Sequence, residues 1–74
     1  MKKEQEVTKT KQIFTQNLIN LRGGRSIYKV AKDIDVSYSY LHDLENGNSN
    51  TPSFVMMEKL ADYYGVNVAD LMTE

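Results

Sequence analysis

Hydrophobic residues recur at helical spacing in short blocks along the 74-residue chain. The first clear block holds Phe14, Leu18 and Leu21, which fall at i, i+4 and i+7. This spacing predicts one apolar stripe of a helix that ends near Arg22. Gly23 follows at once, and glycine readily takes the left-handed conformation that helix ends favour.

Two further short helices are predicted over residues 26–34 and 37–46. Ser26 and Ser37, eleven residues apart, are good N-caps, and Gly47 ends the second of these helices. Almost no linker separates the two. The side chains expected to point inward are Val30, Ala31, Ile34, Leu41 and Leu44.

The remaining residues predict two more helices. Thr51 followed by Pro52 signals a helix start, because proline fits the first helical position, where its missing N–H is no loss. Gly65 ends that helix, and Asn67 caps a last short one. The inward face of the fourth helix is expected to hold Phe54, Met57, Leu60, Ala61 and Tyr64.

No pattern typical of strands appears, so the fold class is predicted to be all-α, with five short helices in one compact domain over residues 9–74. Residues 1–8 are polar and lysine-rich, with only Val7 to bury. They predict a flexible basic arm, which either grips DNA or remains a solubilising tail.

Composition excludes several classes of protein. A hydrophobic share of 41% and a charged share of 26% are typical of an ordinary globular domain. The chain has no cysteine and one histidine, His42, whereas zinc sites draw on several such ligands. Neither a glycine-rich phosphate loop nor a nucleophile–base pair is present. No run of about 20 apolar residues and no secretory signal appear. We therefore expect a cytoplasmic non-enzyme without metal, cofactor or small-molecule ligand.

Charge is unevenly distributed along the chain. Residues 1–32 hold eight lysines and arginines against two glutamates, whereas residues 33–74 hold one lysine against eight acidic residues. Such asymmetry suggests one face that can meet a polyanion and another that would repel it. Charges that merely solvate a small domain would give the same count.

Two short helices joined by almost no linker are the sequence form of a helix-turn-helix. The stretch from Phe14 to Met72 resembles the Cro/C1-type (XRE-type) helix-turn-helix DNA-binding domain of phage and bacterial regulators. The matching pieces are Leu21–Arg22, Val30–Ala31, Val36–Ser37, Leu41, Leu44–Glu45–Asn46–Gly47, Pro52, Leu60–Ala61, Gly65–Val66 and Leu71.

The resemblance implies that the third helix enters the major groove with its N-terminal residues against base edges. The implied base-reading residues are Ser37, Tyr38, Ser39 and Asp43. Those implied to contact the DNA backbone are Arg25, Ser26, Lys29, Lys32, Tyr40, His42 and Asn48, with the neutral loop 48–53. Packing is the alternative role for the two tyrosines, and plain solvent exposure is the alternative for His42.

The resemblance also implies an ion pair between Arg22 and Glu45, the alternative for Glu45 being a surface carboxylate. The sequence departs from the family pattern at three places. Ile27 stands where glutamine is frequent, and Asp35 where glycine is frequent in the turn. The third helix has neither Arg nor Lys, so the commonest contact to guanine is missing.

An apolar outer surface on the last two helices suggests a homodimer. Its two recognition helices would lie about 34 Å apart on a palindromic operator. Scattered surface apolar residues on a monomer are the alternative. The residues expected in the dimer patch are Val55, Met56, Tyr63, Val68 and Met72.

We therefore expect a sequence-specific regulator that binds double-stranded DNA, and a repressor rather than an activator, because repression needs only occupancy of a promoter. The rival hypothesis is a helix-turn-helix protein that binds a protein partner, as an antitoxin or as an antagonist of another regulator. The third helix, which is acidic and has no arginine, favours that rival.

Overall fold

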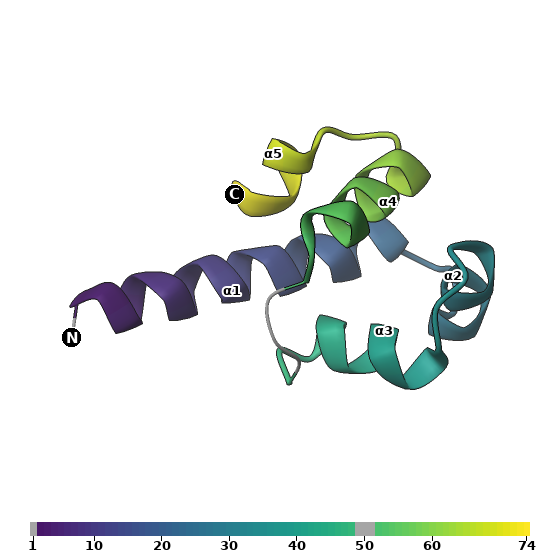
Figure 1. Cartoon of the computed structure of the whole chain (residues 1–74), viewed down its shortest axis with the longest axis horizontal. Helices are drawn as coiled ribbons and strands as arrows, with labels where there is room; N and C mark the ends of the chain where they lie inside the picture. The colour runs from purple at the N-terminus through teal and green to yellow at the C-terminus, as the bar shows by residue number, and fades with distance from the viewer. Residues whose placement is uncertain (1, 49–51) are drawn as a thin grey trace.

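Five helices account for the regular structure in the computed structural model. It describes the backbone of residues 2–48 and 52–74 and the side chains of residues 9–48 and 52–74. Within these ranges there are helices, turns and loops but no strand. The predicted all-α, five-helix fold is confirmed. The helices are α1 (Lys2–Arg22), α2 (Ile27–Asp33), α3 (Tyr38–Glu45), α4 (Phe54–Tyr64) and α5 (Val68–Met72) (Figure 1).

The first helix is longer than the hydrophobic pattern predicts. It begins at Lys2, so the backbone of residues 2–8 is helical where an arm is expected. Lysine, glutamate and glutamine, which dominate this segment, have high intrinsic helix propensity and need no buried face to continue a helix. The domain boundary placed after residue 8 stays a prediction.

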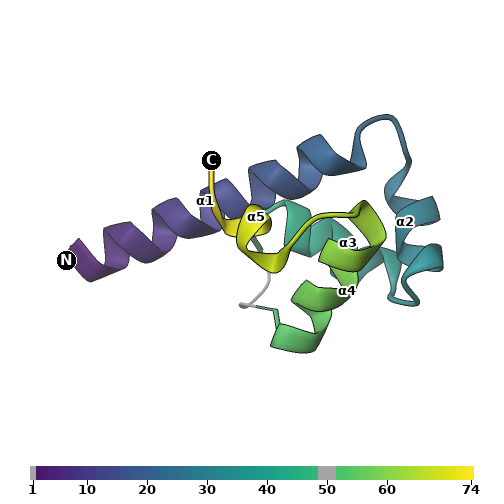
Figure 2. The same cartoon turned by 90° about the horizontal axis from the view of Figure 1, so that it is seen from above.

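Every helix contributes a fully buried side chain to one core. The five are Leu18, Val30, Leu41, Leu60 and Leu71, each at most 1% exposed. Burying each side chain of this size stabilises the fold by about 1.5–3 kcal/mol. Because these residues meet in one cluster, the five helices form a single domain around it. Figure 2 shows α5 lying across the middle of α1.

The turn between α2 and α3 contains a residue in the left-handed conformation. Asp35 has φ 61°, and its N–H donates to the carbonyl of Lys32 at 3.3 Å. The N–H of Val36 donates to the carbonyl of Ala31 at 2.9 Å. These two bonds are a Schellman ending, which satisfies carbonyls at the end of α2. Aspartate tolerates this conformation better than most residues, which explains how the turn forms without glycine.

The start of α4 and its first side chain differ from the prediction. Ser53 is the N-cap and its Oγ accepts the N–H of Met56 at 3.1 Å, so the helix begins at Phe54 rather than at Thr51–Pro52. Thr51 itself lies outside the described residues. Phe54, expected to face inward, is 67% exposed. It occupies the first position of α4, before the helix reaches the core at Met57.

A side chain of α1 holds the end of the chain in place. Asn17 Nδ2 donates to the carbonyl of Leu71 at 2.9 Å and to that of Thr73 at 2.8 Å. These carbonyls belong to the end of α5 and to the residues after it, which lack helical partners of their own. Asn17 therefore fixes α5 against α1.

Candidate nucleic-acid interface

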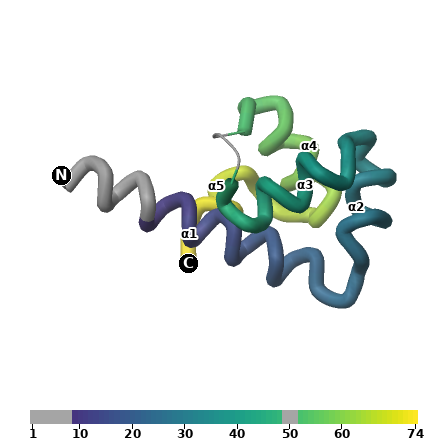
Figure 3. The backbone as a smooth tube through the Cα atoms, turned by 90° about the horizontal axis from the view of Figure 1, so that it is seen from below, coloured from purple at the N-terminus to yellow at the C-terminus, as the bar shows by residue number. Residues whose placement is uncertain are grey.

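The helix α3 lies on the outside of the bundle, opposite α4 and α5 (Figures 1 and 3). Leu41 and Leu44 face the core, which leaves the other side of the helix to solvent. Tyr38 and Ser39 are exposed, and the side chains of His42 and Asp43 are about half exposed. Three of the four residues expected to read bases therefore lie on one accessible helix, with Ser37 immediately before it.

Two aromatic rings stack on the exposed face of α3. Tyr38 and His42 are one helical turn apart, and their ring centroids are 5.9 Å apart with an angle of 21° between the planes. Asp43 Oδ1 lies 3.6 Å from His42 Nδ1. The face thus presents a stacked ring pair with a carboxylate beside it, and no lysine or arginine from α3 itself.

An ion pair fixes where α3 sits. Arg22 Nε donates to both carboxylate oxygens of Glu45, at 3.0 and 2.9 Å. Glu45 is 3% exposed, and this hydrogen bond raises the pKa of Arg22 above its ordinary value. Arg22 Nη1 also donates to the carbonyl of Arg25 at 2.7 Å. The end of α1 and the end of α3 are therefore joined through a buried carboxylate.

A serine hydroxyl caps each helix of the helix-turn-helix. Ser26 Oγ accepts the N–H of Lys29, and Ser37 Oγ accepts the N–H of Tyr40, each at 3.0 Å. A serine hydroxyl has one proton to donate and two lone pairs, so an acceptor role in the cap leaves the proton free. Both serines are exposed and can donate to a phosphate or base while capping their helices.

The two lysines of α2 differ in their surroundings. Lys29 Nζ lies 3.1 Å from Asp33 Oδ2, in an i,i+4 ion pair, whereas Lys32 is exposed. Asp33 also accepts a hydrogen bond from the Tyr63 hydroxyl at 2.7 Å. The bond from Tyr63, and then that from Lys29, hold the pKa of the Asp33 carboxyl below its ordinary value. A phosphate would therefore compete with Asp33 for Lys29 but not for Lys32.

The Arg25 side chain is held against its own protein, whereas a contact to phosphate would require it to extend away from these partners. Its Nη2 donates to the carbonyl of Leu21 at 3.0 Å, which caps the end of α1. The guanidinium carbon lies 5.5 Å from the ring centroid of Tyr63 and 5.3 Å from that of Tyr64. The expected phosphate contact from Arg25 stays a prediction, and it would require Arg25 to leave these partners.

A model of the helix-turn-helix family matches residues 18–71 of the chain. The chain belongs to the Cro/C1-type helix-turn-helix family. The matched range contains α2, α3 and α4, the end of α1 and α5 up to Leu71, and therefore the whole surface just described. Membership implies DNA as the binding partner, and domains of this kind are typically without enzymatic activity. Neither the curated proteins nor the solved structures contain a match to the chain.

The other residues expected at the DNA backbone of this helix-turn-helix domain, Tyr40 and Asn48, differ in exposure. Tyr40 is half-buried and packs against the core. Asn48 is exposed, and its N–H donates to the carbonyl of Asp43 at 2.9 Å. Residues 49–51 of the expected contact loop lie outside the described residues.

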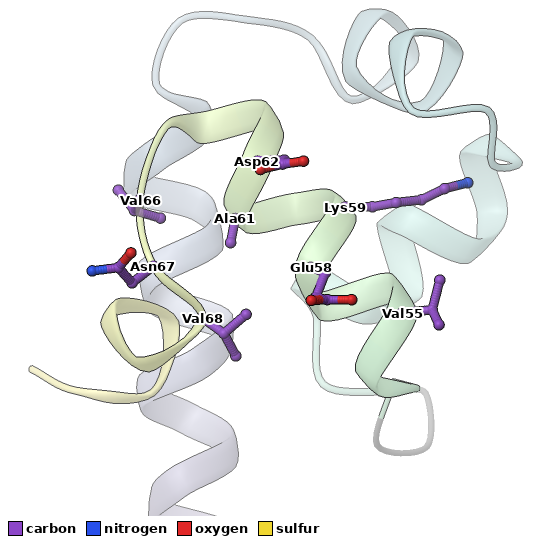
Figure 4. Close-up of a pocket in the computed structure, with 8 residues that line it drawn as sticks. All are labelled: Val55, Glu58, Lys59, Ala61, Asp62, Val66, Asn67 and Val68. Atoms are coloured by element: carbon purple, nitrogen blue, oxygen red, sulfur yellow. The ribbon is translucent and has the colours of Figure 1, made fainter.

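The residues of the expected dimer patch differ in their exposure and contacts. Val55 is 64% exposed. Met56, Val68 and Met72 are partly buried against the core, and Tyr63 is occupied by its bond to Asp33. Val55 and Val68 line a groove between α4 and the segment leading into α5 (Figure 4). The other residues that line it are Glu58, Lys59, Ala61, Asp62, Val66 and Asn67.

In residues 9–48 and 52–74, no group of three or more His, Cys, Asp or Glu side chains is arranged to hold a metal ion. Across the part of the chain with a described backbone, no helix has the length and apolar character needed to cross a membrane.

Sequence reasoning overlooked contacts that depend on the fold. The hydrogen bond between Tyr63 and Asp33 joins residues 30 positions apart in the sequence, and no local sequence pattern predicts it. Lys59 Nζ donates to the carbonyl of Ile34 at 3.3 Å, which ties α4 to the turn before α3. The stack of Tyr38 on His42 could have been predicted from their i,i+4 spacing, since residues four apart are neighbours on a helix.

Proposed function

We propose that this helix-turn-helix protein is a sequence-specific regulator that binds double-stranded DNA and represses transcription by occupying a promoter. The observation that carries the proposal is the exposed face of α3. Its polar and aromatic side chains are free of core packing, and the helix itself is anchored at its far end by Arg22 and Glu45. A helix held in this way can be presented to a groove without losing its place in the fold.

The proposed contacts fall into two classes. Ser37, Tyr38, Ser39 and Asp43 read base edges. Ser26, Lys29 and Lys32, at α2, contact phosphates, as do Arg25, Tyr40, His42 and Asn48 in supporting positions. Phosphate contacts fix the orientation of the protein, whereas contacts to base edges determine the preferred sequence.

The test is selection of bound duplexes from a random double-stranded pool by the purified protein, at about 50 and 200 mM salt. We expect an enriched sequence whose affinity falls steeply with salt, because neutralised phosphates release counterions. Ser39→Ala and Asp43→Ala should change the enriched bases, while Lys32→Ala should weaken every duplex alike. If no sequence is enriched at either salt concentration, sequence-specific DNA binding is wrong.

We further propose that the protein binds a palindromic operator as a homodimer. The support is that α4 and α5 leave the apolar side chains of Val55, Met56, Val68 and Met72 exposed or only partly buried. Val55 and Val68 line the groove between the two helices. Enriched half-sites should then lie about one helical turn apart, near 34 Å. A single unrepeated site, together with a monomer mass in solution, would contradict the dimer.

The second candidate function is binding to a protein partner. It is favoured by one observation: α3 presents Asp43 and no lysine or arginine, which weakens its attraction to a polyanion. Failure of the selection at low salt would favour this candidate. Enrichment of a sequence would reject it as the main role of α3.

A further inference from the structure

Given the proposed DNA binding, one feature of α3 restricts which bases the helix can contact. Tyr38 and His42 are stacked, with ring centroids 5.9 Å apart and planes at 21°. Both side chains are exposed, Tyr38 to 51%. The ring pair therefore offers apolar area to a molecule that docks on α3.

The position of the pair determines which part of a duplex it can meet. Tyr38 is the first residue of α3, and the N-terminal residues of a recognition helix contact base edges. In the major groove the only apolar group that a base presents is the C5 methyl group of thymine. We propose that Tyr38, held by its stack on His42, packs against a thymine methyl group in the operator.

Asp43 adds a second restriction beside the ring pair. A carboxylate accepts hydrogen bonds and donates none when ionised, and its Oδ1 lies 3.6 Å from His42 Nδ1. Guanine presents two acceptors in the major groove, whereas cytosine and adenine each present an amine donor. The base that meets Asp43, beside the thymine, is therefore cytosine or adenine, whose amine can donate to the carboxylate. Guanine at that place is rejected, because it presents only acceptors.

In this arrangement His42 is a positioning residue rather than a base-reading one. Stacking limits the rotamers of Tyr38, so less conformational entropy is lost when its ring meets the DNA. An aromatic residue at 42 should preserve this effect and alanine should remove it. Phenylalanine keeps the ring but lacks both nitrogen atoms, so it separates stacking from hydrogen bonding.

The experiment compares thymine with uracil, which differ only by the methyl group in question. The best duplex from the selection is made with each thymine replaced in turn by deoxyuridine. We expect one replacement per half-site to weaken binding about fourfold, the change that corresponds to burying one group of methyl size. Tyr38→Ala should bind thymine and uracil duplexes equally, whereas Tyr38→Phe should keep the difference.

Variants at two other positions complete the design. His42→Phe should keep the discrimination between thymine and uracil, and His42→Ala should reduce it. Tyr28→Ala is the matched control, because Tyr28 is an exposed tyrosine on α2, 67% exposed and outside α3. It should keep the full discrimination even if it changes overall affinity. Retained helical circular dichroism in each variant confirms that the comparison is between folded proteins.

The results separate this inference from the proposed function. Tight, sequence-specific binding with equal affinity for thymine and uracil at every position would overturn the methyl contact and leave DNA binding intact. Discrimination that survives in Tyr38→Ala would overturn the assignment to Tyr38. An absence of binding to any duplex would overturn both proposals.

Discussion

Arg22 and Glu45 join the last turn of α1 to the last turn of α3 through two hydrogen bonds from one nitrogen atom. The carboxylate is almost completely buried, whereas the side chain of Arg22 keeps 20% of its exposure. A buried carboxylate is stable only with a partner, because its hydration is lost in the fold. The pair therefore determines the position of the recognition helix.

Loss of the arginine should be strongly destabilising. We expect Arg22→Met to lower the free energy of unfolding by about 3–5 kcal/mol, because it leaves the Glu45 carboxylate buried and unpaired. Urea titration followed by circular dichroism measures the change. The control is the double variant Arg22→Met with Glu45→Leu, which removes both charges and should recover most of the loss. A loss below about 1 kcal/mol for Arg22→Met would show that water can reach the carboxylate.

The left-handed residue in the turn offers a stabilising substitution. Asp35→Gly should raise the free energy of unfolding by about 0.5–1 kcal/mol, because glycine adopts a positive φ without the steric cost that other residues incur. Asp35→Ala should lower it instead, since alanine lacks the local hydrogen bonds that aspartate can make. Thermal unfolding of the two variants beside the parent protein gives the order. The reverse order would mean that the carboxylate has a role in the turn beyond its conformation.

Tyr64 should make stability sensitive to alkaline pH. Burial, and then the nearby Glu45 charge, raise the pKa of Tyr64 from 10.0 to about 12. Above pH 10 the tyrosine of the unfolded chain loses its proton while Tyr64 in the fold keeps it. The free energy of unfolding therefore falls between pH 10 and pH 12, because the folded state binds more protons.

The Tyr64→Phe variant tests this dependence. Among the described residues the buried Tyr64 hydroxyl has no hydrogen-bond partner, so its removal should be neutral or stabilising by about 1 kcal/mol at pH 7. Urea titrations at pH 9, 10.5 and 11.5 should show a smaller alkaline loss in the variant. Tyr28→Phe, at an exposed position, should behave as the parent does. An equal loss in all three proteins would place the alkaline sensitivity elsewhere.

Lys32, exposed on α2, and Lys59, bonded to the backbone from α4, should differ in their effect on DNA binding. Lys32→Ala should reduce the slope of log affinity against log salt by about 0.9, the value for one lost phosphate contact. Lys59→Ala removes the same charge from α4, where Lys59 binds the carbonyl of Ile34, and should leave the slope nearly unchanged. Fluorescence anisotropy at several salt concentrations measures both slopes. Equal slopes would show that α2 does not face the phosphates.

Much of the fold can be predicted from the sequence, because helix starts and ends depend on residues close together in the chain. Glycines 23, 47 and 65 each follow a helix and have positive φ, as the predicted helix ends require. Ser26 and Ser37 cap the helices they were expected to cap. The start of α4 was misplaced because Pro52 and Ser53 are both plausible first-turn residues. Only the bond from the Met56 N–H to Ser53 decides between them.

The surroundings of the candidate site could be predicted less well than the site itself. Exposure of Tyr38 and Ser39 follows from the helical period, because the leucines of α3 occupy the other face. The contacts of Arg25 with Tyr63 and Tyr64 do not, since these residues come together only when the end of α4 lies beside the loop after α1. A basic residue near a helix start is therefore weak evidence for a phosphate contact until its neighbours in space are known.

The bonds from Asn17 to the carbonyls after α5 have a consequence for synthesis on the ribosome. Asn17 meets partners 54 and 56 positions later in the chain. Leu18, beside it, belongs to the same core as Leu71. Contacts of such long sequence separation form late in folding, because a large loop must close first. The part of the α1 apolar stripe that α5 covers therefore stays exposed on the nascent chain until α5 has emerged. Aggregation or chaperone binding can compete with folding during this interval.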